Sequence, residues 1–279
     1  LKRVKGQLRL SDEEFRGIAN PDHVYFARIP LEINGEDRWV TLFRIKHDLT
    51  LGVGGGGIRY IYPQDLAASS NIQYFRRDPN YPHEVEVLGV RTLGEARKFV
   101  ETWVFEETLA LAIGMTLKNA SVGLDLGGAK GTVLLGDVRE RNGKFYLRPL
   151  TTGNLSLDIL LLARITRDIS RRFCQTGVVR HTNDKPAPDV NTTYRDSQPQ
   201  IRIIEWFMDE HLETLYELEL IQDEGLREVL SQVSGQDTSS ADDSFLLGTK
   251  YLEAAVNYHN QTRRAVPELA TYTGKSVEL

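Results

Sequence analysis

The sequence contains only one cysteine, Cys174, among its 279 residues. One cysteine cannot form a disulfide within the chain, so we expect a reducing compartment, by default the cytoplasm. Apolar runs are short as well. None approaches the roughly 18 residues that a membrane-spanning helix requires, and no apolar signal core follows the basic N-terminal residues. The sequence therefore predicts neither a membrane span nor a secretory signal.

Charge of one sign is not in excess either. The formal net charge is -5, which gives no bias towards nucleic acid or an anionic membrane, and basic residues are not interleaved with aromatic ones as in a nucleic-acid groove. The histidines form neither an H-E-x-x-H motif nor a cluster with metal-ligand spacing. No serine lies in a G-x-S-x-G motif, so a hydrolase triad has no support. We expect no metal, no nucleic acid and no membrane among the partners.

The first elements along the chain are predicted to be two strands, at residues 24–33 and 38–46. Asn34-Gly35 lies between them and supplies the positive φ angles of a tight hairpin. From Leu93 to about Asn119, apolar residues recur mostly at three- and four-residue spacing. This periodicity predicts a long amphipathic helix.

Further helices alternate with short apolar strands. One helix is expected from Ser156, as its N-cap, to Phe173, and another from about Ser197, with Pro199 in its first turn. The short apolar run 132–136, which follows a glycine-rich turn at 127–131, is typical of a buried strand. Such alternation indicates an α/β sandwich.

Three segments look like additions to this framework. Residues 61–92 are rich in Tyr, Asn, Pro and charge and show little periodicity. Residues 137–155 are predicted to form a polar hairpin around Arg141-Asn142-Gly143. Residues 214–262 contain acidic helical segments that a flexible stretch interrupts at 235–240.

Residues 52–57 formally match the G-x-G-x-x-G pattern of dinucleotide-binding turns. That pattern must open a helix whose N-terminus meets the pyrophosphate, whereas the following residues 58–63 are extended and β-prone. We expect instead that the glycines let the backbone pass close to a small molecule.

Two lysines and one aspartate are candidates for chemistry. Lys130 lies in Gly-Gly-Ala-Lys-Gly-Thr, where the residue order excludes a Walker phosphate loop. Small neighbours and flanking apolar runs favour a partly desolvated amine, which suits proton transfer. Lys118 ends the long helix, one turn after Met115. Asp189 follows two prolines in a rigid turn. Taken singly, each of the three is also consistent with an ordinary structural residue.

These segments occur together, in this order, in one family. The chain resembles the N-terminal domain of the glutamate/leucine/phenylalanine/valine dehydrogenases. Four stretches carry the resemblance: residues 44–60, residues 114–131, Pro-Ala-Pro-Asp-Val-Asn-Thr at 186–192, and Thr-Gly-Lys at 273–275. The resemblance implies a three-layer α/β/α sandwich with a mixed, partly parallel sheet.

The resemblance also implies a reaction and a role for each candidate residue. The reaction is the reversible oxidative deamination of an L-amino acid to a 2-oxo acid and ammonia, with hydride transfer to NAD or NADP. Lys118 would hold the substrate α-carboxylate, Lys130 would be the catalytic lysine, and Asp189 would exchange protons with the substrate nitrogen. Met115 and the backbone of Gly55 and Gly56 would line the pocket.

Two features depart from the usual pattern of the family. Glutamate-specific members usually carry a lysine where Gly55 stands, so Gly55 favours an apolar substrate side chain. In the family, Thr-Gly-Lys leads into the nucleotide-binding domain, whereas this sequence stops at Leu279. We therefore expect a substrate-binding and oligomerisation domain at 1–267, the start of a hinge at 268–279, and no NAD(P) binding or turnover by the chain alone.

The family's N-terminal domain carries most subunit contacts, so a homo-oligomer, from a dimer to a hexamer, is implied. A second hypothesis is a non-catalytic homologue that keeps the fold for assembly or regulation. A third is a nucleotide-binding module built on residues 52–57, which requires a helix directly after Gly57. Convergence of Lys118, Lys130 and Asp189 on one cleft would distinguish the enzyme from the other two.

Overall fold

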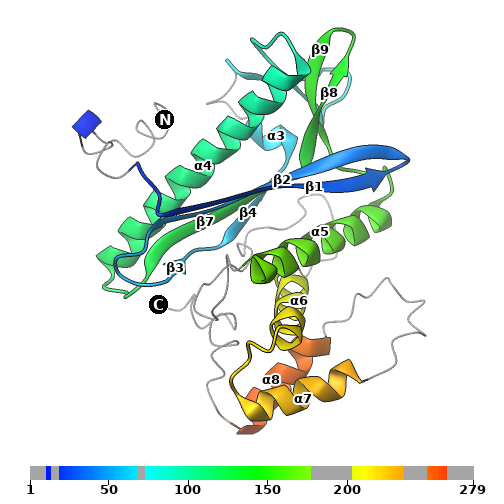
Figure 1. Ribbon diagram of the computed structural model, residues 1–279. Helices are drawn as coiled ribbons and strands as arrows, with labels where there is room; N and C mark the ends of the chain where they lie inside the picture. The colour runs from blue at the N-terminus through cyan, green and yellow to red at the C-terminus, as the bar shows by residue number, and fades with distance from the viewer. Residues whose placement is uncertain (1–10, 14–18, 68–72, 177–202, 236–249, 263–279) are drawn as a thin grey trace. The chain divides into compact units, whose positions relative to one another are not determined.

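The computed structural model describes residues 11–13, 19–67, 73–176, 203–235 and 250–262. The chain divides into two compact units, residues 1–153 and 154–279. The first contains the strands with helices α3 and α4, and the second contains α5 to α8 (Figure 1). In the described part of the chain, no helix is long and apolar enough to span a membrane. The predicted hinge at 268–279 lies outside the described residues.

A five-stranded mixed sheet forms the centre of the first unit. β1 (His23–Ile33) pairs antiparallel with β2 (Glu36–Asp48), and β2 pairs antiparallel with β7 (Gly127–Leu134). β3 (Gly54–Gly55) and β4 (Ile58–Ile61) both run parallel to β7. The predicted α/β fold class with a mixed, partly parallel sheet is confirmed.

Two hairpins of this unit are closed by Asn-Gly turns. Asn34 and Gly35, between β1 and β2, have φ angles of 53° and 76°, as a tight hairpin turn requires. Asn142 and Gly143, at 53° and 70°, join β8 (Gly136–Arg141) to β9 (Lys144–Pro149). Both predicted hairpins are confirmed. The second is not polar throughout, because Phe145 and Leu147 are buried.

The 29-residue helix α4 (Leu93–Ser121) lies along the central sheet (Figure 1). Its extent agrees with the predicted helix. At its start, the Thr92 side chain accepts a hydrogen bond from the backbone N–H of Glu95 at 3.1 Å, which satisfies one of the free donors of the first turn. Further along, Leu109 and Ile113 share a buried cluster with Ile45 of β2. Removing these side chains from water holds α4 on the sheet.

A second sheet has four antiparallel strands in the order β5-β6-β9-β8. β5 (Phe75–Arg77) and β6 (Val85–Val87) come from the segment 61–92, which also contains the short helix α3 (Pro63–Leu66). Phe75 of β5 packs edge-on against Trp103 of α4, with ring centroids 5.9 Å apart. The segment that lacked periodicity in the sequence therefore forms two strands, each too short to show it.

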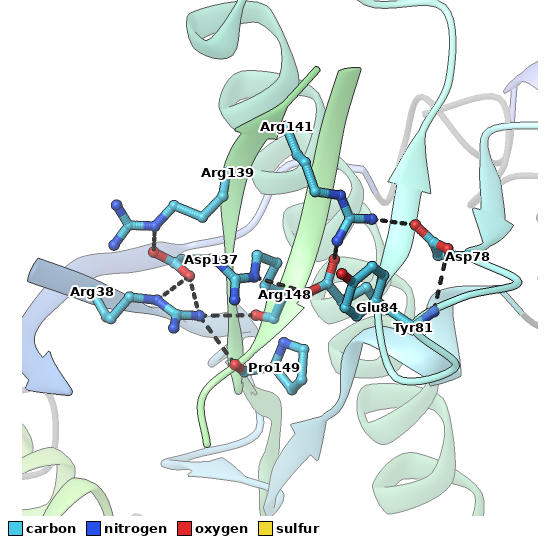
Figure 2. Close-up of polar contacts among 9 residues, drawn as sticks. All are labelled: Arg38, Asp78, Tyr81, Glu84, Asp137, Arg139, Arg141, Arg148 and Pro149. Atoms are coloured by element: carbon cyan, nitrogen blue, oxygen red, sulfur yellow. Dashed lines mark hydrogen bonds and ion pairs between the residues drawn. The ribbon is translucent and has the colours of Figure 1, made fainter. Parts of the chain in front are cut away.

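Arginine–carboxylate pairs connect the second sheet to its surroundings (Figure 2). Arg38 of β2 donates to Asp137 of β8 at 2.6 Å, and their side chains are only 5% and 6% exposed. Arg141 of β8 pairs with Asp78 and Glu84 from the segment that joins β5 to β6. Buried ion pairs contribute little net stability but tolerate few alternative arrangements. The Arg38–Asp137 pair therefore ties β8 of the second sheet to β2 of the first, and the Arg141 pairs hold the β5–β6 connection on the second sheet itself.

The second unit is helical over its described residues, with α5 (Leu155–Gln175), α6 (Ile203–Glu217), α7 (Glu224–Ser234) and α8 (Lys250–Thr262). The predicted N-cap of α5, Ser156, is wrong. Asn154 is the cap, and its Oδ1 accepts hydrogen bonds from the N–H groups of Ser156 at 3.0 Å and Leu157 at 3.3 Å. Ser156 is thus already inside the first turn. The predicted helix start near Ser197 lies outside the described residues.

The glycine-rich stretch 127–131 is strand, where the sequence predicted a turn. It belongs to β7 and is paired on both edges, with β2 and with β3 and β4. The glycines allow a neighbouring helix to pack closely on the strand, and they do not form a turn. A Cβ on Gly128 would lie 2.0 Å from Thr116 Oγ1 and 2.6 Å from the carbonyl oxygen of Ala112, so α4 rests directly on the backbone of β7.

The replacement Gly128→Ala should lower the free energy of unfolding by about 2–3 kcal/mol, because α4 must move away from β7 to admit the methyl group. Urea denaturation followed by circular dichroism measures this. Gly114→Ala on the same helix is the matched control. A Cβ there meets nothing within 4 Å, so this change should stabilise the protein by about 0.5–1 kcal/mol. Equal stabilities of the two variants would contradict the close contact.

Candidate functional site

Two glycine-rich segments run side by side at the candidate site. β3 pairs in parallel with Gly127-Gly128, and the backbone N–H of Gly131 donates to the carbonyl oxygen of Gly57 at 2.9 Å. Residues 58–61 continue as strand β4, not as a helix. A nucleotide-binding module built on residues 52–57, which requires a helix directly after Gly57, is therefore excluded.

Gly56 is the point of closest approach between the two segments. Its φ of 152° favours glycine, and a Cβ there would lie 1.7 Å from the carbonyl oxygen of Ala129. The same Cβ would lie 3.3 Å from Met115 Cγ of α4. Two of the predicted pocket residues, Gly56 and Met115, are thus brought together by the fold.

The last turns of α4 lie against the same glycine segments. Asn119 is 4% exposed, and its Nδ2 donates to the carbonyl oxygen of Gly127 at 2.8 Å. One turn earlier, Thr116 Oγ1 lies 2.8 Å from Nδ1 of the buried His47 on β2. These contacts fix the end of α4, and with it Met115 and Lys118, which are three residues apart and share a helix face.

The two predicted lysines differ in their surroundings. Lys130 lies on β7 opposite Ile45 and is 7% exposed. Side chains on one face of a strand repeat every two residues, so Lys130 shares the face of Gly128, which α4 covers. Lys118, in the last turn of α4, is exposed. Asp189, the third predicted residue, lies outside the described residues.

Arg44 of β2 is a residue of this site that the sequence analysis did not select. It is fully buried and lies opposite Gly131. Its guanidinium donates to the carbonyl oxygens of Gly56 at 2.7 Å, Gly57 at 3.4 Å and Gly54 at 3.5 Å. One charged side chain therefore holds the glycine segment through charge-assisted hydrogen bonds. The sequence feature that could have identified it is a lone arginine within the apolar run Leu-Phe-Arg-Ile, which indicates a buried charge.

A cysteine–histidine pair in the second unit has no catalytic character. Cys174 Sγ lies 3.0 Å from His211 Nδ1. Burial raises the pKa of the Cys174 thiol to about 12 and lowers the pKa of the His211 imidazole to about 3. Both groups are therefore neutral at physiological pH, whereas a nucleophilic cysteine requires a thiolate. Among the described residues, no group of three His, Cys, Asp or Glu side chains could hold a metal ion.

Comparison with known proteins gives one family match and several relatives. Residues 92–148 match the Glu/Leu/Phe/Val dehydrogenase dimerisation domain. A glutamate dehydrogenase of Aeropyrum pernix is 25% identical over 214 residues, which cover 76% of this chain and 35% of that protein. A leucine dehydrogenase of Bacillus cereus is 44% identical over 66 residues, 21% of this chain and 18% of that protein. The glutamate dehydrogenase structure from Peptoniphilus asaccharolyticus aligns with a TM-score of 0.39 at 20% identity, over 76% of this chain and 37% of that one.

The family resemblance predicted from the sequence is confirmed by the family match and the two sequence relatives. The chain spans 35% of the length of the Aeropyrum relative and 18% of the Bacillus one. The matched segment 92–148 contains α4, β7 and most of the β8–β9 hairpin. It therefore includes Met115 and both predicted lysines.

The replacement Arg44→Met should release the glycine segment, because three carbonyl oxygens lose their charged donor. Amide hydrogen exchange measured by mass spectrometry should become at least about tenfold faster for residues 53–57, the loss expected for charge-assisted hydrogen bonds. Arg59→Met is the matched control, since that arginine is on the adjacent strand β4 with a side chain 44% exposed. Its exchange should stay close to wild type. Identical exchange in both variants would refute the role of Arg44.

The stability of the protein should fall with acid in a way that depends on His211. Its folded pKa of about 3 lies below the unfolded value of 6.5, so its contribution is complete above pH 6.5 and is lost as the pH falls towards 3. The loss is about 1.4 kcal/mol per pH unit. Denaturant unfolding between pH 6.5 and 4.5 should therefore show a shallower slope for His211→Gln than for wild type. The same change at the exposed His23 should leave the wild-type slope, and parallel slopes for all three proteins would count against a buried neutral imidazole.

Proposed function

Because residues 92–148 match the dimerisation domain of the Glu/Leu/Phe/Val dehydrogenases, we propose that this chain is the substrate-binding and catalytic-lysine half of an NAD(P)-dependent amino-acid dehydrogenase. The proposed reaction is the reversible oxidative deamination of an L-amino acid to a 2-oxo acid and ammonia. One observation carries the proposal. The buried Lys130 lies on a strand that packs against both the glycine segment and the end of α4, where Met115 and Lys118 are found.

In the proposed mechanism the exposed lysine binds the substrate and the buried lysine takes part in the reaction. Lys118 is open to solvent and meets the incoming substrate, and its compact ammonium holds the α-carboxylate. Lys130 is 7% exposed, and hydrogen bonds from a charged donor are stronger where water is excluded. Its ammonium stabilises negative charge on the substrate carbonyl oxygen, or orients the water that attacks the imine. Asp189 exchanges protons with the substrate nitrogen.

An apolar amino acid is the proposed substrate. Gly55 is buried, and a Cβ there would lie 3.3 Å from both Asn119 Nδ2 and Leu126 Cδ1. A longer side chain at this position would require both neighbours to shift. Gly55 itself has no side chain, so this position supplies no cation that could bind a side-chain carboxylate. The absence of such a cation favours a substrate with an apolar side chain.

The proposed cofactor, oligomeric state and compartment follow from the same family resemblance. NAD or NADP supplies or accepts the hydride when bound, and we assign no residue of this chain to it. The description of the family as a dimerisation domain supports a homo-oligomer, from a dimer to a hexamer. Cys174 is a buried free thiol, which is compatible with a reducing compartment such as the cytoplasm.

The test is an assay of the full protein encoded by the gene, with leucine, valine, phenylalanine and glutamate as substrates and NAD+ or NADP+ as acceptor, followed by NAD(P)H absorbance. Lys130→Ala should lower kcat by about 10²–10⁴, the usual contribution of a positioned acid or base. Lys118→Ala should chiefly raise KM, by about tenfold or more, because the carboxylate loses its ion partner.

Lys144→Ala is the control for removing a lysine, because this residue is on β9 with a side chain 55% exposed and should leave both constants unchanged. A wild-type kcat in Lys130→Ala would refute the catalytic assignment. A folded, oligomeric protein that turns over none of these substrates would favour the alternative, a non-catalytic homologue that serves assembly or regulation.

A further inference from the structure

A cavity of about 140 Å³ lies in the first unit and shares no lining residue with the predicted lysine site. Its floor is apolar and comes from α4, β7, β8 and β9, through Val100, Leu134, Val138 and Leu147. Each of these side chains is at most 4% exposed, so the floor is part of the core. Trp39 and Thr41 of β2 form one wall.

The cavity is large enough for a small organic molecule. An engineered apolar cavity of about 150 Å³ in another protein stays dry and binds benzene. By this comparison the cavity admits about six to eight non-hydrogen atoms. Its apolar floor favours hydrocarbon over a sugar or a phosphate, because a polar group placed there would find no hydrogen-bond partner.

Within the described part of the chain, the charged side chains that line the cavity are paired, with one exception. Glu101 Oε1 lies 2.6 Å from Arg28 Nε. Asp137 is held by Arg38 at 2.6 Å and by Arg139 at 2.9 Å (Figure 2). Both carboxylates that line the cavity are therefore neutralised by arginines.

Arg97 is the exception. It lines the cavity from α4, and among the described residues its guanidinium has no hydrogen-bond or ion-pair partner. An arginine presents five N–H donors in a planar fork that matches a carboxylate. The cavity is therefore lined both by apolar side chains and by a partly exposed arginine that has no protein partner among the described residues.

We propose that this cavity binds a small monocarboxylate with an apolar chain of about five or six carbons. The carboxylate pairs with Arg97, and the chain lies on Val100, Leu134 and Val138. A cationic ligand would face Arg97, and a neutral one would leave it unpaired. The site is independent of the lysine pair, so it would serve an effector or carried ligand and not the substrate being oxidised.

The test is a titration of the 279-residue protein with 4-methylpentanoate, which has neither an amino group to oxidise nor an oxo group to reduce. Calorimetry gives the Kd, and the indole N–H resonance of 15N-labelled Trp39, assigned with Trp39→Phe, reports binding at the cavity wall. We expect saturable binding with a shift of this resonance. Arg97→Gln should raise the Kd at least about tenfold, as for the loss of a charge-assisted hydrogen bond.

Lys98→Gln is the matched control, since it removes the same charge from the next position of α4, where the side chain is exposed and does not line the cavity. The Kd should be that of wild type. The neutral 4-methylpentanamide and the amine 4-methylpentan-1-amine should bind at least about tenfold more weakly than the acid.

Three results would overturn the proposal: equal affinity for acid and amide, no saturable shift of Trp39 at millimolar probe, or a Kd that rises in Lys118→Gln and not in Arg97→Gln. The last result would place the probe at the lysine site. That result would support the proposed function and refute the proposal that the cavity binds the carboxylate.

Discussion

The contact of α4 with the backbone of β7 is the constraint on which the rest of the first unit depends. It exists because Gly128 has no side chain where Thr116 and Ala112 pass. On the neighbouring edge, Gly56 lies against the carbonyl oxygen of Ala129 for the same reason. The helix α4, the strand β7 and the glycine segment around Gly56 therefore pack with their backbones in direct contact. Positions set by backbone packing have little freedom, which is what a site that must orient a substrate requires.

This packing accounts for the different surroundings of the two lysines. Lys130 is buried on the strand, whereas Lys118, at the end of the helix that packs on this strand, stays exposed. Arg44 supports the same arrangement from within the sheet. Its guanidinium holds three carbonyl oxygens of the glycine segment, so the segment keeps its course although its residues have almost no side chains to pack.

Elements with a local signal could be predicted from the sequence. The hairpin turns follow from Asn-Gly, and α4 from its apolar spacing. The strand at 127–131 could not, because glycine signals a turn unless neighbouring chains pair with it on both sides, and those neighbours come from distant residues. The role of Arg44 could not be predicted for a similar reason, since its partners are backbone carbonyl oxygens, which no side-chain pattern reveals. The order Lys118, Lys130, Asp189 indicated the family, and α4 and β7 place the first two. Asp189 remains a prediction.

The central proposal is that Lys118 and Lys130 act on the same bound substrate. A structure of the protein with a bound 2-oxo acid tests it most directly. We expect the carboxylate within about 3 Å of Lys118 Nζ and the carbonyl oxygen at a similar distance from Lys130 Nζ, with Gly56 and Met115 beside the ligand. A ligand that contacts neither lysine, or only one of them, would contradict it.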